Sequence, residues 1–178
     1  MKKWIAFFSH TGTEIYNICR SIDRFPDLLI TNNTLDSINK NLIESIDVTT
    51  VDSKLTGKDY SNILGSPNDV IVTLHGWMRI VPADVCDVYE TYNLHPGLIS
   101  RYPELKGKDP QHAAFSSRKH RYQDVGCVIH KVTPELDSGE IIMERSTPNT
   151  FYNFDELNSC LHKMAGEMWT YLLPDILK

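Results

Sequence analysis

The chain has 178 residues, of which 41% are hydrophobic and 10% aromatic, and it carries a formal net charge of −5 at pH 7. This apolar content is enough for a buried core without disulfides or a structural metal, so we expect one domain over residues 1–178. The acidic balance excludes a general basic field and argues against nucleic acid as a partner, although a few local groups can still hold a small anion.

The cysteines and the N-terminus indicate a compartment. Cys19, Cys86, Cys127 and Cys160 are too widely spaced for a structural zinc site, and we interpret them as reduced core thiols. The apolar run at residues 4–8 is too short for a secretory signal or a membrane span. We therefore expect a cytoplasmic protein without bound metal or a membrane partner, as a monomer or homodimer.

A strand, a polar turn and a helix begin the chain. The continuous apolar run at residues 4–8 is typical of a strand buried on both faces, and the turn at residues 9–14 contains a glycine. Apolar residues then recur on one face of a predicted helix, at Ile15, Ile18, Cys19 and Ile22. This arrangement points N–H groups at an anion, but an ordinary N-cap turn gives the same pattern.

The next segments predict further strands. Residues 28–31, 46–51 and 69–74 are short apolar or β-branched runs with polar neighbours. Residues 34–43 are weakly helical. Residues 55–65 are polar and fit no single element, so their structure stays open.

An apolar loop follows the last of these strands. It contains Met78, Ile80 and Val81. Pro82 then suits the first turn of a helix over residues 83–89. The apolar side chains either pack under that helix or line a pocket for a flat apolar ligand, since open α/β sheets bind ligands beyond the carboxyl ends of their strands.

Two polar side chains lie at the end of the next strand. In the strand predicted at residues 91–95, Asn93 and His95 are two residues apart and therefore lie on the same side. Pro96 ends this strand. Residues 97–110 are rich in proline, glycine and charge, which indicates a mobile or binding loop.

A second acidic candidate lies between two later strands. A helical piece at residues 111–117 precedes strands at residues 125–132 and 139–144. The turn that joins these strands brings Asp137 out at a loop. An Asp before Ser-Gly is also a common turn residue, so this position alone does not establish a function.

The last helix is predicted from its cap and its apolar face. Asn153 and Glu156 have the spacing of a capping box. Apolar residues follow at helical spacing, at Phe154, Leu157, Leu161, Met164, Met168 and Leu172. Gly166 inside the helix costs roughly 1 kcal/mol relative to alanine. We expect Pro174 to end the helix.

Asn93, His95 and Asp137 combine the groups that acyl transfer to an amine requires. A neutral amide can donate to a growing oxyanion, an imidazole can move a proton, and a carboxylate can orient that imidazole. Histidines are usually only hydrogen-bonded, so the assignment depends on what surrounds these residues.

Four stretches in order carry a family resemblance. They are Ser-His-Thr-Gly-Thr-Glu-Ile at residues 9–15, Gly-Trp-Met-Arg-Ile at 76–80, Asn-Leu-His-Pro at 93–96, and the strand and loop at 126–139. Together they resemble the formyltransferases that use 10-formyltetrahydrofolate, most closely the phosphoribosylglycinamide formyltransferase branch. The resemblance implies an α/β fold, with an open, twisted, mostly parallel sheet and helices on both faces, as in the Rossmann-like formyltransferase domain.

The resemblance also implies a role for each site residue. Asn93, His95 and Asp137 would be the catalytic set, in which Asn93 donates to the oxyanion, His95 relays the amine proton, and Asp137 orients the imidazole and raises its pKa. The implied folate pocket consists of Met78, Arg79, Ile80, Val81, Glu135 and Leu136. The implied acceptor site consists of Gly12, Thr13, Glu14, Pro96 and Glu167.

This sequence departs from the branch at the acceptor end. His10 replaces a glycine of the phosphate loop, and Thr13 and Glu14 replace Ser and Asn, so a carboxylate stands where an anion is expected to bind. Glu167 is an approximate match to the acid that holds the substrate amine. Residues 106–110 resemble the loops of transfer-RNA and sugar formyltransferases.

The resulting hypothesis is an enzyme that moves the formyl group of 10-formyltetrahydrofolate to a primary amine. Glycinamide ribonucleotide of purine biosynthesis is the first candidate acceptor. An amino sugar nucleotide or another modified nucleotide is the alternative. A hydrolase that releases formate from the same donor, and a non-catalytic folate or nucleotide binder, are the remaining alternatives.

Overall fold

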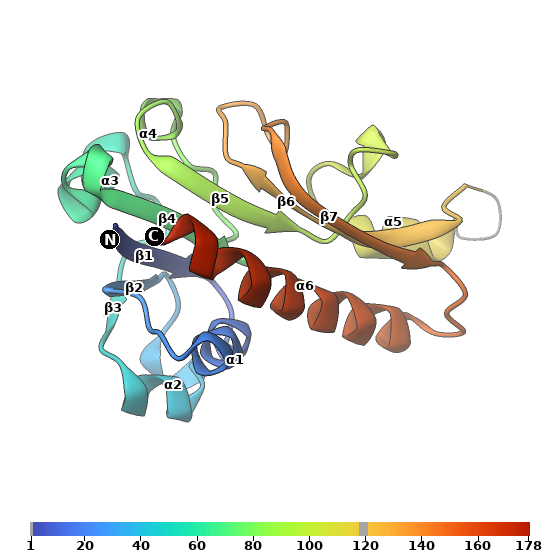
Figure 1. The fold of residues 1–178 in the computed structure, drawn as a ribbon, viewed down its shortest axis with the longest axis horizontal. Helices are drawn as coiled ribbons and strands as arrows, with labels where there is room; N and C mark the ends of the chain where they lie inside the picture. Colours follow the sequence, from blue (N-terminus) through green and yellow to red (C-terminus); the bar gives the residue numbers. More distant parts are fainter. Residues whose placement is uncertain (1, 118–120) are drawn as a thin grey trace.

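One sheet of seven strands runs through the computed structural model, which describes residues 2–117 and 121–178 (Figure 1). The strands are β1 (Lys3–Phe8), β2 (Leu28–Thr31), β3 (Val48–Thr50), β4 (Val70–His75), β5 (Glu90–His95), β6 (Asp124–Lys131) and β7 (Ile141–Pro148). Their order is β3-β2-β1-β4-β5-β6-β7. The first five pair in parallel, whereas β6 pairs antiparallel with β5 and with β7. The predicted open, mostly parallel sheet is confirmed.

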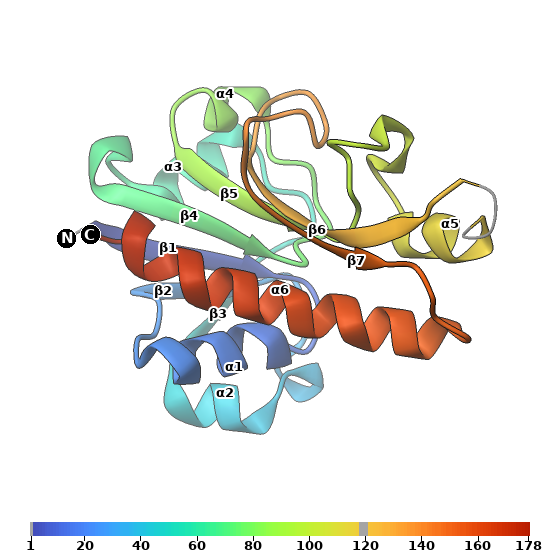
Figure 2. The same ribbon diagram turned by 45° about the vertical axis from the view of Figure 1, so that its right-hand side comes forward.

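Helices cover both faces of this sheet (Figure 2). The α-helices are α1 (Thr13–Ile22), α2 (Lys40–Ser45), α3 (Gly57–Leu64), α4 (Ala83–Cys86), α5 (Pro110–Ser116) and α6 (Phe154–Ile176), and three 3-10 helices span Leu35–Ser37, Pro67–Asp69 and Pro103–Leu105. Helices α1, α2 and α6 share one apolar cluster with the sheet, and α3 and α4 share the other.

Strand β1 is central because its side chains are apolar on both faces. Trp4, Ala6 and Phe8 pack toward α1 and α6, whereas Ile5 and Phe7 pack toward α3 and α4. A run without polar alternation can only be buried between two layers, which is why the pattern predicted this strand correctly.

Core packing yields a direct stability prediction. Leu29 on β2 is fully buried in the cluster that includes α1. Replacing it with alanine should lower the free energy of unfolding by about 2 to 5 kcal/mol, because transfer free energy is lost and a cavity remains. Urea denaturation measures this. The matched change Leu35→Ala, at a side chain that is 46% exposed, should have little effect, and equal losses in both variants would contradict this packing.

The C-terminal helix continues past the residue that was expected to end it. Helix α6 includes Pro174 and ends at Ile176, so that prediction is wrong. Proline removes one N–H in the last turn, but Leu173 and Leu177 on either side are buried, and Leu177 N donates to Leu173 O at 3.1 Å. Burial of these leucines compensates for the lost hydrogen bond. The predicted Asn153 cap is confirmed, since its side chain accepts from Glu156 N.

Other boundaries differ in ways that local chemistry explains. Residues 55–65, which received no assignment, contain α3 with a capping box formed by Thr56 and Asp59. The helix predicted at residues 83–89 ends at Cys86, and Pro82 is its N-cap rather than part of its first turn. Leu98 and Leu105 of the loop over residues 97–110 are buried, so this segment is anchored in the core.

Candidate active site

A cavity of about 1520 Å³ lies along the carboxyl ends of the parallel strands. It is lined by the loops after β1 and β4, the end of β5, the turn between β6 and β7, and part of α6. A ligand pocket at this edge of an open α/β sheet was one of the two alternatives that the sequence left open. The cavity contains Asn93, His95 and Asp137, which come from β5 and from the turn after β6.

The antiparallel pairing of β5 and β6 brings a second histidine into the centre. Asn93 and His130 lie directly opposite each other in the register of the two strands. Asn93 Nδ2 is 3.3 Å from His130 Nε2, and the other ring nitrogen of His130 donates to Lys131 O at 2.8 Å. His130 was not among the predicted site residues. Its position in β6 could have predicted a place in the site only if the pairing of β6 with β5 had been known.

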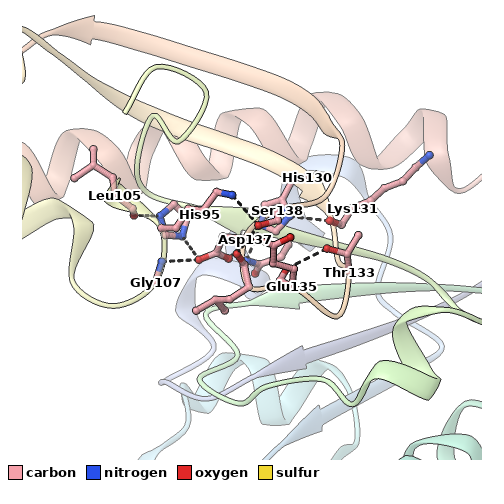
Figure 3. A network of polar contacts seen from close by, with 12 residues as sticks. His95, Leu105, Gly107, His130, Lys131, Thr133, Glu135, Asp137 and Ser138 are labelled. Carbon is pink, nitrogen blue, oxygen red and sulfur yellow. Dashed lines mark hydrogen bonds and ion pairs between the residues drawn. The ribbon is translucent and has the colours of Figure 1, made fainter. Parts of the chain in front are cut away.

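Asp137 joins the two histidines, as Figure 3 shows. Its Oδ2 lies 3.3 Å from His95 Nδ1 and accepts from Gly107 N at 2.8 Å, while its Oδ1 lies 3.5 Å from His130 Nε2. Burial raises the pKa of this carboxyl, but the contacts with His130, His95 and Gly107 outweigh burial and lower it below the ordinary value. Asp137 is therefore a carboxylate at neutral pH.

His95 faces an acceptor on each side of its ring. Nε2 donates to Leu105 O at 2.7 Å, and Nδ1 faces Asp137. Only a doubly protonated ring satisfies both acceptors. Burial nevertheless lowers the pKa of His95 more than Asp137 and Leu105 raise it. Asp137 therefore raises the pKa of His95 as expected, but the net shift is downward because desolvation disfavours the cation. A lowered pKa makes the imidazolium a stronger acid.

The segment after the 3-10 helix Pro103–Leu105 holds this network in place. Gly107 has φ +86°, in the left-handed region that glycine tolerates, and this conformation presents its N–H to Asp137. Lys106 Nζ donates to Ser138 Oγ at 2.7 Å beside the same turn. The sequence indicated a binding loop here but not that its backbone would fix His95 and Asp137.

The residues expected to form a folate pocket are divided between cavity and core. Met78 and Ile80 line the cavity and are 54% and 79% exposed, and Leu136 across from them is 56% exposed. Arg79 also lines the cavity, and its guanidinium donates to Met78 O at 3.0 Å. Val81 also lines the cavity, but its side chain is buried in the apolar cluster that includes α3 and α4.

Glu135 does not belong to the cavity lining. Its carbonyl closes the turn, since it accepts from Thr133 Oγ1 at 3.0 Å and from Ser138 N at 3.3 Å, and its side chain is exposed. Its expected contact with the folate therefore stays a prediction. The turn uses this residue to present its neighbours Leu136 and Asp137.

The residues expected at the acceptor end all reach the cavity. Gly12, the N-cap of α1 with φ +74°, lies there with Thr13, Glu14 and Pro96. A side chain at position 12 would collide with Leu42, so glycine is needed at that point.

Glu167, the fifth expected residue, is held by an ion pair. It lies at the exposed side of the cavity, where Arg145 on β7 contacts its carboxylate at 2.7 Å. An exposed ion pair of this kind contributes little to stability. It does, however, direct the carboxylate toward β7 and away from the central network.

Glu14 lies between two histidines that the sequence analysis did not select. Its Oε1 is 3.8 Å from His75 Nδ1, and its Oε2 is 3.7 Å from His162 Nδ1. Burial by itself raises the pKa of Glu14, but His162 and His75 lower it to about 2. Contact with Glu14 in turn raises the pKa of His162 above its ordinary value.

The low pKa of Glu14 predicts an acid-dependent stability. Because the folded pKa is depressed from 4.5 to about 2, the carboxylate stabilises the fold above pH 4.5, and this contribution is lost as pH falls toward 2. The contribution is at most about 3 kcal/mol. Unfolding free energies of the wild type and of Glu14→Gln, measured across this range, should have different pH slopes. If the unfolding free energies of the two proteins changed equally with pH, the folded state would not stabilise the ionised form of Glu14.

The described part of the chain was searched for membrane-spanning helices and for groups of metal ligands. No helix there is long and apolar enough to cross a membrane. Residues 2–117 and 121–178 also contain no group of three or more His, Cys, Asp or Glu side chains placed to hold a metal ion.

The sequence matches a family model described as Formyl transferase over residues 35–167. A phosphoribosylglycinamide formyltransferase of Dictyostelium discoideum is 35% identical over 98 residues, which cover 51% of this chain and 44% of that protein. The chain therefore spans less than half the length of this curated relative.

Solved structures share the fold. The phosphoribosylglycinamide formyltransferase of Campylobacter jejuni has a TM-score of 0.81 at 20% identity and covers 100% of this chain and 99% of its own. A sugar N-formyltransferase from Shewanella has a TM-score of 0.70 at 19% identity, with 97% of this chain and 68% of its own covered. At these identities the likeness concerns the architecture, which both kinds of acceptor specificity have in common.

Proposed function

The chain belongs to the formyl transferase family, whose members are folate-dependent enzymes with 10-formyltetrahydrofolate as co-substrate, and from this premise we propose that it moves a formyl group to a primary amine. The observation that carries the proposal is the central network of Asn93, His95, His130 and Asp137. The same cavity is lined by exposed apolar side chains such as Met78 and by polar ones such as Glu14.

Each member of the network has a role in the proposed reaction. The amine nitrogen forms a bond to the formyl carbon, the bond from that carbon to the folate nitrogen breaks, and negative charge grows on the formyl oxygen between these events. Asn93 stabilises this charge as a hydrogen-bond donor, and protonated His95 stabilises it as a nearby positive charge. His95 also carries the proton that the amine loses to the departing folate nitrogen, and Asp137 holds the ring in position.

The apolar end of the cavity fits a flat heterocycle. Met78, Ile80 and Leu136 are large apolar side chains that remain exposed there, which is unusual unless a ligand covers them. We propose that they hold the ring system of the donor. Its formyl group would then be directed toward Asn93 and His95.

The acceptor has two candidates. Glycinamide ribonucleotide is favoured by the names of the relatives from Dictyostelium and Campylobacter. An amino sugar nucleotide or another modified nucleotide is favoured by the carboxylate of Glu14, which stands where a phosphate would approach the start of α1, and by the likeness to the Shewanella enzyme. In both cases the acceptor lies beside Gly12, Thr13 and Pro96.

An assay with the purified protein tests the proposal. The chain is incubated with 10-formyltetrahydrofolate and a panel of amines that includes glycinamide ribonucleotide and amino sugar nucleotides. Release of tetrahydrofolate that depends on an amine supports the transferase. Formate release without any amine would identify a hydrolase, and binding of the donor without turnover would identify a folate-binding protein.

We further propose that residues 1–178 act as one formyltransferase domain in the cytoplasm, with a small-molecule acceptor and without nucleic acid or a membrane as partner. The continuous sheet and the cavity that holds the catalytic network support this organisation.

A further inference from the structure

A second group of titratable side chains lies in the same cavity, apart from the catalytic network. Glu14 at the start of α1, His75 at the end of β4 and His162 on α6 all line its polar end. The carboxylate oxygens lie 3.7 and 3.8 Å from the two imidazole nitrogens, which is too long for direct hydrogen bonds. Both oxygens therefore keep acceptor capacity for a ligand.

His75 is a buried group whose polar atom lacks a partner. The residue is 4% exposed, and its Nδ1 makes no hydrogen bond. A buried chain of donors fixes the ring, because Trp4 Nε1 donates to Thr73 Oγ1 at 2.8 Å, and that hydroxyl lies 2.9 Å from His75 Nε2. When Thr73 donates to Nε2, the proton of His75 is on Nδ1, which faces Glu14. A buried polar atom without a hydrogen-bond partner is a position at which a ligand atom can bind.

Part of the turn before α1 is used by the chain itself. Thr11 Oγ1 accepts from Thr13 N at 3.4 Å, and Asn39 Nδ2 donates to Thr13 Oγ1 at 3.2 Å. Glu14 itself supplies the negative charge that the N-terminus of the ten-residue helix α1 favours. A phosphate at this position would approach a carboxylate.

We propose that Glu14, His75 and His162 form a site that recognises uncharged hydroxyl groups of the acceptor and disfavours a phosphate there. The site rests on the proposed formyl transfer and defines its acceptor class, namely an amine carried on a hydroxylated, sugar-like group without a phosphomonoester at this end. A hydroxyl can donate to a Glu14 oxygen and accept from His75 Nδ1 at once, which satisfies both groups.

The charge of Glu14 is what disfavours a phosphate at this point. Its carboxylate is ionised, because its pKa is about 2, and contact with it raises the pKa of His162. Lys163 lines the same cavity and opposes a cation rather than an anion, so the preference against a phosphate rests on Glu14. A neutral hydroxyl avoids repulsion from both kinds of charge and has donor and acceptor capacity.

A matched pair of acceptors tests the proposal. Glycinamide ribonucleotide and the corresponding ribonucleoside differ only in the phosphate, and kcat/KM for each is measured from tetrahydrofolate release. The wild type should use the ribonucleoside at least as well as the ribonucleotide. Glu14→Gln should shift the ratio toward the ribonucleotide by at least roughly tenfold, since one opposing charge is removed. The control Glu44→Gln, at an exposed position on α2, should leave the ratio unchanged.

Two results would overturn the proposal. One is a wild-type preference for the ribonucleotide of tenfold or more, and the other is an unchanged ratio in Glu14→Gln. If no amine is formylated, the proposed function fails. Ligand binding to the wild type then tests the hydroxyl site independently of turnover. Methyl riboside, but not ribose 5-phosphate, should shift the ring signals of His75 and His162 in NMR titrations of the wild type. Equal or tighter binding of ribose 5-phosphate would contradict hydroxyl recognition.

Discussion

His95→Ala is expected to lower kcat by about 10³-fold while changing the affinity for the folate donor by less than roughly tenfold. The imidazole is the group that can stabilise the negative formyl oxygen by its charge and relay the amine proton, whereas the exposed apolar side chains of the cavity would hold the donor ring. Steady-state kinetics give kcat, and fluorescence titration gives the donor affinity.

Controls separate chemistry from folding in this variant. Because His95 is 5% exposed, its loss can destabilise the protein, so unfolding curves accompany the kinetics. His112→Ala removes a histidine that stacks on Phe154, with ring centroids 3.8 Å apart, outside the cavity lining. That variant should keep its turnover. Wild-type turnover in His95→Ala would contradict the mechanism whatever the acceptor.

Asp137→Asn is expected to lower kcat by roughly 10² to 10³-fold, because a neutral amide no longer favours the protonated ring of His95. Gly107 N and His130 Nε2 also lose a charged acceptor. The control Asp36→Asn, at an exposed position in the 3-10 helix Leu35–Ser37, should have no effect.

The pH profile of the Asp137 variant has a defined sign. Burial already lowers the pKa of His95, and the charge of Asp137 is the largest influence that raises it again. Turnover that needs the imidazolium is present below this pKa and falls as pH rises through it. Without the carboxylate the pKa falls further, so the decline in kcat should begin at a lower pH than in the wild type. A decline that moves to higher pH would contradict the assigned roles.

The sheet and its helices were predictable where one residue pattern admits one structure. The unbroken apolar run of β1 requires burial on both faces, and the apolar spacing of α6 requires a long helix. The end predicted at Pro174 was wrong because the burial of Leu173 and Leu177 outweighs the loss of one backbone hydrogen bond at the proline. Similarly, the helix predicted after Pro82 was too long, because the spacing of apolar residues does not show at which residue a helix ends.

The site was predictable only for groups whose position follows from a single strand or turn. Asn93 and His95 follow from the alternation of β5, but His130 joins them through an antiparallel pairing that the sequence does not display. Leu105 contributes a backbone carbonyl, which no residue type encodes. The effect of Asp137 on the pKa of His95 was expected correctly, but the larger opposing effect of burial was not, because a sequence gives the partner charge and not the depth of burial.

The most direct measurement follows the formyl group itself. The purified chain is given 10-formyltetrahydrofolate with a ¹³C-labelled formyl group and each amine of the panel, and products are identified by NMR and mass spectrometry. The proposed function requires one acceptor to carry the label as an N-formyl group, in amounts equal to the tetrahydrofolate released. Label recovered only as formate, or remaining on the folate with every acceptor, would contradict it.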